Sequence, residues 1–142
     1  MSVVELHMSQ RRDRILEAAR RIIGRRGVEG LTMRDLADAA GVTPPTVYNL
    51  VGGKDAILAS LLAQVLERAL AATAAFEEGS PIDRAFAVSA AGYAELLAQP
   101  EYARALLRHF ITTNHDDPLR RAIDVQHTAM MAEVLRDAQA AG

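Results

Sequence analysis

The sequence predicts an all-α fold, on three observations. Half of its 142 residues are hydrophobic, but only 4% are aromatic. Alanine and leucine dominate the apolar positions and favour helices, whereas strands would need runs of β-branched residues. Glycine and proline recur at intervals that divide the chain into segments of helical length.

The first predicted helix begins after a cap at Ser9 and ends at about Arg26, where Gly27 follows. Apolar residues recur along it at helical spacing. They are Ile15, Ala18, Ala19, Ile22 and Ile23.

Two shorter helices are predicted next. Thr32 is placed to cap a helix from Met33 to Ala40, which Gly41 ends. Thr43 is likewise predicted to cap a helix from Pro44 to about Val51. Adjacent prolines normally break a helix, but a proline in the first turn is tolerated because its missing N–H would have no intrahelical partner there.

Further helices are predicted in the rest of the chain. One runs from Lys54 to about Phe76, and the next from Pro81 to about Ala98. Ser80 and Asp83 have the spacing of a capping box at the start of the latter. The remaining helix starts are placed by the same logic at Pro100 and Pro118.

The spacing between residues 33 and 50 is that of a helix-turn-helix. Ala37 is small enough for two helices to cross closely, and Gly41 can adopt the positive φ of a sharp turn. Buried positions expected in this common core are Ile15, Ile22, Leu36, Val42, Val47 and Leu58. An ordinary αα-hairpin is the alternative that this pattern leaves open.

Charge is distributed unevenly along the chain. Residues 1–55 hold nine Lys and Arg against seven Asp and Glu, a net +2, whereas residues 56–142 hold seven against eleven, a net −4. An arginine run in the first helix accounts for most of the basic residues, and it is either a solvated helix face or a surface for an anionic partner. Its members are Arg11, Arg12, Arg14, Arg20, Arg21, Arg25 and Arg26.

The region from about Arg14 to Leu62 resembles the TetR family of bacterial transcriptional regulators. The resemblance rests on the arginine-rich first helix ending in Gly27 and on the motifs Asp35-Leu36-Ala37, Ala40-Gly41-Val42-Thr43, Thr46-Val47-Tyr48 and Lys54-Asp55. It implies a helix-turn-helix domain, residues 1–53, and a helical regulatory and dimerisation domain, residues 54–142. It also implies a homodimer that binds double-stranded operator DNA and releases it when a small-molecule effector binds.

The predicted DNA-binding residues combine base readers and phosphate contacts. Asn49 suits adenine and Arg34 suits guanine, while prolines offer apolar surface to a thymine methyl. Lys54 begins a helix and could contact a phosphate, or be simply solvated; Tyr48 could contact DNA or pack. The full set is Arg34, Thr43, Pro44, Pro45, Thr46, Tyr48, Asn49 and Lys54.

A ligand-binding cavity in the second domain would need bulky apolar side chains, although such residues are also ordinary core. The candidates are Phe76, Phe86, Tyr93, Tyr102, Phe110 and Met130. The spacings of His109, His115 and His127 match no compact metal-ligand pair, so neither metal nor cofactor is expected.

Other functional classes find less support in the sequence. No nucleophile with a base, metal cluster or phosphate-binding loop is apparent, so an enzyme is not expected. A helical protein-interaction module that has lost DNA binding stays open, because Leu50 and Val51 stand where the family usually has tyrosine or histidine and then phenylalanine. The chain has no cysteine and no long apolar run, which favours a cytoplasmic protein without a membrane partner.

Overall fold

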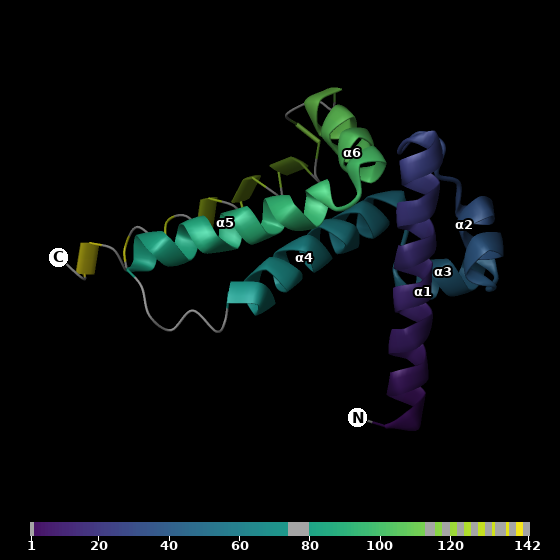
Figure 1. Ribbon diagram of the computed structural model, residues 1–142. Helices are drawn as coiled ribbons and strands as arrows, with labels where there is room; N and C mark the ends of the chain where they lie inside the picture. The colour runs from purple at the N-terminus through teal and green to yellow at the C-terminus, as the bar shows by residue number, and fades with distance from the viewer. Residues whose placement is uncertain are drawn as a thin grey trace. The chain divides into compact units, whose positions relative to one another are not determined.

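The computed structural model is all-α, as predicted. It describes residues 2–73 and 80–112, and shorter pieces at 116–117, 120–121, 124–125, 128–129, 132, 136 and 139–140. None of these residues is in a β-strand. The helices, shown in Figure 1, are α1 (Val3–Arg26), α2 (Met33–Ala40), α3 (Pro44–Leu50), α4 (Lys54–Thr73), α5 (Pro81–Leu97) and α6 (Pro100–Thr112).

The chain forms two compact units. The first comprises Met1–Leu62 with Gln99–Thr112, and the second comprises Ala63–Ala98 with Thr113–Gly142. Helix α4 therefore contributes to both units, while α6 belongs with α1, α2 and α3. The functional boundary predicted between residues 53 and 54 stays a prediction.

Helix α1 begins earlier than predicted. Its N-cap is Ser2 rather than Ser9, and Ser2 and Glu5 form a capping box: the Ser2 N–H donates to Glu5 Oε2 and the Glu5 N–H donates to Ser2 Oγ at 3.2 Å. All residues from Ser2 to Arg11 are exposed. Apolar periodicity could not locate this start, because the first turns pack against nothing in the unit.

The core of the first unit lies among α1, α2, α3, the start of α4, and α6. Five of the six predicted core positions are buried, and Val42 is only half-buried. Val42 was wrongly predicted because it follows the turn glycine directly and stays at the edge of the seam. The largest fully buried side chains are Ile15, Leu16, Ile23, Leu36, Ile57, Leu58, Leu61, Val28 and Val47.

Helix α6 completes this core by packing against α1. Tyr102, Ala103 and Leu106 are buried on its inner side. Gly24 faces this contact, and a Cβ there would lie 3.7 Å from the Tyr102 backbone nitrogen, an ordinary van der Waals distance, so a methyl group would fit. The first turns of α6 therefore stabilise the unit that contains the helix-turn-helix.

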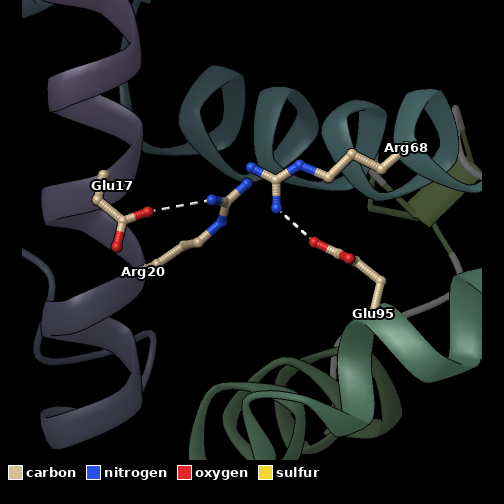
Figure 2. A network of polar contacts seen from close by, with 4 residues as sticks. All are labelled: Glu17, Arg20, Arg68 and Glu95. Atoms are coloured by element: carbon tan, nitrogen blue, oxygen red, sulfur yellow. Dashed lines mark hydrogen bonds and ion pairs between the residues drawn. The ribbon is translucent and has the colours of Figure 1, made fainter. Parts of the chain in front are cut away.

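Several arginines of the predicted run have structural roles. Arg20 is buried, and its guanidinium donates to Glu17 at 3.1 Å (Figure 2). Arg12 donates to Ser60 Oγ of α4 at 3.1 Å. In the second unit, Arg68 of α4 pairs with Glu95 of α5, also drawn in Figure 2. The arginine run is thus neither uniformly solvated nor uniformly available to a partner.

Candidate nucleic-acid interface

The turn between α2 and α3 has the geometry that the sequence predicted. Gly41 adopts the left-handed conformation, with φ 68° and ψ 39°. The Val42 N–H donates to the Ala37 carbonyl at 3.0 Å and the Gly41 N–H to the Asp38 carbonyl at 3.3 Å. This pair of bonds is a Schellman motif, which satisfies the last carbonyls of α2 and redirects the chain into α3.

Helix α2 is also fixed at its start. The Asp35 N–H donates to Thr32 Oγ1 at 3.1 Å, which confirms Thr32 as the cap. The Asp35 carboxylate in turn accepts from Arg26 at 2.9 Å, linking the end of α1 to α2. The support that Arg26 gives to this helix was not predicted, although a basic residue in the last turn of α1 and an acid in the first turn of α2 are signals for it. Arg34 follows on the exposed surface of α2.

The start of α3 is built without a side-chain cap. Thr43 occupies the N-cap position, but its hydroxyl bonds no backbone N–H. Pro44 and Pro45 have no N–H to satisfy, and the Thr46 N–H donates to the Thr43 carbonyl at 3.0 Å. The Thr43 hydroxyl instead lies 2.9 Å from that of Thr46, leaving a hydroxyl pair at the helix start.

Helix α3 anchors itself through one residue and exposes most of the others. Val47 is fully buried, whereas Pro44, Pro45 and Asn49 are exposed and Thr46 is half-buried. A short helix held from beneath by one apolar anchor can present its opposite side to a partner.

Tyr48 and Lys54 lie on either side of the turn that follows α3. The Tyr48 side chain is 54% exposed, and its Cε1 would lie 3.8 Å from a Cβ at Gly53. Tyr48 therefore both packs on the turn and reaches solvent. Lys54, the first residue of α4, is half-buried. The backbone supports it, since the Ile57 N–H donates to the Gly53 carbonyl at 3.0 Å.

A family model described as "Bacterial regulatory proteins, tetR family" matches residues 15–61. This segment contains the whole helix-turn-helix and the start of α4. Residues 15–61 therefore match the TetR family.

Relatives and solved structures agree with this assignment. The chain is 27% identical over 127 residues to the HTH-type transcriptional regulator BetI of Brucella canis, covering 88% of this chain and 64% of that protein. It is 26% identical to the HTH-type transcriptional repressor KstR2 of Rhodococcus jostii, covering 86% of this chain and 48% of that protein. The chain thus spans less than two thirds of the length of either relative.

The fold agrees as well. A tetR family transcription regulator from Shewanella sp. PV-4 superposes with a TM-score of 0.66 at 24% identity, covering 93% of this chain and 71% of that one. This likeness shows the TetR-like helical fold. The relatives are named as regulators, and the family is not an enzymatic one.

The predicted ligand-binding residues fall in different places. Phe86 and Tyr93 lie on α5 with side chains 71% and 68% exposed, whereas Tyr102 is buried in the first unit. Phe110 is in α6. Phe76 and Met130 lie outside the described residues, as do the predicted helix start at Pro118, His115 and His127. Their role in ligand binding stays a prediction.

In the described part of the chain, no group of three or more His, Cys, Asp or Glu residues could hold a metal ion. No helix there combines the length and apolar character needed to cross a bilayer.

Proposed function

We propose that this chain is a TetR-family transcriptional regulator that binds double-stranded DNA through α3. The observation that carries the proposal is the exposed side of α3, with Pro44, Pro45 and Asn49 held outward above the buried Val47. The rigid turn at Gly41 fixes the direction of this helix. In helix-turn-helix proteins, the second helix enters the major groove and its N-terminal residues meet base edges.

Few side chains of this site can read bases. Asn49 can bond bidentately to adenine and Arg34 to guanine, while the two prolines can contact thymine methyl groups. Helix α3 carries no charged residue. Direct readout is therefore modest, and the shape and deformability of the DNA contribute a larger share of specificity.

Phosphate contacts would hold the helix in register. Lys54 places an ammonium group at the start of α4, where the first backbone N–H groups also favour an anion. The hydroxyl pair of Thr43 and Thr46 and the hydroxyl of Tyr48 can donate to neighbouring phosphate oxygens. These groups fix position rather than sequence.

The finer features of the function follow from the same proposal. Two chains bind a palindromic operator as a homodimer, with reading helices about 34 to 36 Å apart or somewhat wider. Residues 54–142 provide dimerisation and a site for a small-molecule effector that releases the DNA, so the regulator represses. Leu107 and Ile111, 55% and 79% exposed on α6, are apolar groups that a partner chain could cover.

A second candidate is a protein-interaction module without DNA binding. The observation that favours it is an exposed apolar stripe on one face of α5. Its members are Ile82, Phe86, Tyr93 and Leu97, each at least 48% exposed. This surface could also serve a DNA-binding regulator, so DNA binding decides between the candidates.

The test begins with selection of bound duplexes from a random pool, which should enrich a palindromic consensus. On that operator, Asn49→Ala should lose about 1 to 3 kcal/mol per affected contact and relax preference at one symmetric pair of positions. Lys54→Ala should weaken all sequences alike and reduce the salt slope by about one per half-site. Gln99→Ala and Arg104→Ala, which change exposed residues in the same unit, serve as controls. If both test variants bind like wild type, α3 is not the reading helix.

A further inference from the structure

The N-terminal arm, defined as Val3–Arg14, is a helical segment that is exposed except at its root, where Arg12 is half-buried. Every residue from Ser2 to Arg11 is exposed, including Val3 and Val4 at 69% and 67%. In Figure 1 these first turns of α1 run on past α3. The family model begins at residue 15, so the arm precedes the matched segment.

The arm is preformed. Its capping box at Ser2 and Glu5 satisfies the first backbone N–H groups, and the helix continues without interruption into the buried part of α1. At 1.5 Å per residue the arm is about 18 Å long, which corresponds to about five base pairs of duplex. A partner that binds it need not bear the entropic cost of ordering a flexible tail.

Basic side chains gather on one face of the arm. His7, Arg11 and Arg14 follow each other at spacings of four and three residues, which places them on the same side of a helix. Arg11 and Arg14 are exposed, and within the described residues neither forms an ion pair. Arg12, Arg20 and Arg26 differ, because each bonds a neighbour inside the unit.

The same face contains an open hollow of about 450 Å³ lined by His7, Gln10, Arg11, Asp13 and Arg14. Two guanidinium groups and an imidazole N–H suit an anionic partner. Asp13 reduces the positive potential without cancelling it. The open form suits an extended phosphate backbone better than an enclosed small molecule.

The root of the arm lies near the proposed DNA site. Arg12 contacts Ser60, which is six residues along α4 from Lys54, or about 9 Å at helical rise. The arm thus leaves the unit close to the helix start assigned to a phosphate.

We propose that the N-terminal arm is a second DNA contact, in which Arg11 and Arg14 bind backbone phosphates flanking the segment read by α3. The inference rests on the proposed function and extends it. Arginine suits this role because its planar fork can bond two phosphate oxygens at once. The arm adds affinity and lengthens the protected duplex without reading sequence.

The experiment compares two duplexes that contain the selected operator, one ending at its edges and one extended by about five base pairs on each side, the reach of the arm. Wild type should bind the extended duplex roughly tenfold more tightly at 0.1 M salt. The double variant Arg11→Gln/Arg14→Gln should lose that gain and reduce the salt slope by about two per chain, while binding the short duplex like wild type. Asp13→Asn should bind the extended duplex more tightly.

The charge-matched control is Arg104→Gln/Arg108→Gln, which removes two exposed arginines from α6 and should leave both affinities unchanged. Equal affinity and salt slope for wild type and the Arg11/Arg14 variant on the extended duplex would overturn the arm contact alone. If wild type binds neither duplex, both the proposed DNA-binding function and the arm contact are overturned. Binding of another protein to the arm would not rescue either claim. Circular dichroism of each variant checks that α1 remains folded.

Discussion

Helices α3 and α5 both begin with a hydroxyl residue followed by proline, yet the two starts are built differently. At α5, the Asp83 N–H donates to Ser80 Oγ at 3.3 Å and the Ser80 N–H donates to Asp83 Oδ2 at 3.1 Å. At α3, the equivalent N–H, that of Thr46, donates to the Thr43 carbonyl at 3.0 Å, and the Thr43 hydroxyl lies 2.9 Å from that of Thr46. A capped start uses its polar groups internally, whereas the double-proline start leaves hydroxyls available to a partner.

The two helices also differ in how they are held. Helix α3 has only seven residues but buries Val47 completely, while α5 has 17 residues and none of them is buried. The side chains of α3 that face solvent are polar or proline, with the half-exposed ring of Tyr48 among them. Those of α5 include two large aromatic rings. The contrast separates a short, anchored helix with a mostly polar outer face from a longer helix whose outer face is apolar and could be covered by a partner.

The largest expected effect tests the anchoring of α3. Val47→Ala should lower the free energy of unfolding by about 2 to 3 kcal/mol, because it removes two methyl groups from a fully buried site and leaves a cavity. Phe86→Ala on α5 should change it by less than about 0.5 kcal/mol, since the ring is mostly exposed. Urea denaturation followed by circular dichroism measures both. Equal costs for the two variants would remove the distinction between the helices.

Next in size is overpacking of the α2–α3 crossing. Ala37 is fully buried there, so Ala37→Leu should cost about 1 to 3 kcal/mol and weaken DNA binding by displacing α3. The matched control is Ala94→Leu on α5, where the alanine is exposed and the larger side chain has room. Unchanged thermal stability and DNA affinity in Ala37→Leu would show that the two helices do not cross at this residue.

The helix starts themselves give a smaller effect. Ser80→Ala breaks a capping box and should destabilise α5 by about 1 kcal/mol. Thr43→Ala removes no capping bond, so it should change stability by only a few tenths of a kcal/mol while lowering DNA affinity. Hydrogen exchange of the backbone amides in the first turn of each helix distinguishes the effects of the two variants. A loss of protection in α3 as large as that in α5 would mean that Thr43 acts as a cap after all.

The smallest effect concerns the helix start at Ser2, which is capped like α5. The Ser2 backbone N–H, followed by the Ser2 hydroxyl, stabilises the Glu5 carboxylate and lowers its pKa. Because the pKa of Glu5 is lower in the folded state than in the unfolded state, its capping bond stabilises α1 at pH values above the ordinary glutamate pKa. This stabilisation is lost as the pH falls through the folded-state pKa. An NMR titration should therefore show the first turn of α1 fraying at acid pH. In Glu5→Gln that pH dependence should vanish.

Local rules predicted most of the fold. The bounds of α2, its cap at Thr32, the left-handed turn at Gly41 and the capping box at Ser80 are all confirmed, because each depends on residues within a few positions of one another. The start of α1 was wrong because an exposed helix has no apolar periodicity to reveal it. Burial of Arg20 depends on tertiary packing, which the helical pattern of α1 alone does not encode.

The candidate site was also predictable where it depends on residues close in sequence, and not where it depends on how the chain folds back. Exposure of Pro44, Pro45 and Asn49 follows from the position of Val47 on a short helix. The contact between Tyr48 and Gly53 does not, since it depends on how the chain turns between α3 and α4. The functional roles of the predicted site residues are still predictions that binding experiments have to test.

The most direct test of the central claim is a titration of the wild-type chain into a labelled duplex at low and at moderate salt, followed by fluorescence anisotropy. The account predicts tight association at low salt, with log affinity falling linearly as log salt concentration rises, because basic side chains release counterions from phosphates. A folded protein that shows no association at low salt, or an association that does not respond to salt, would contradict DNA binding and favour the protein-interaction module.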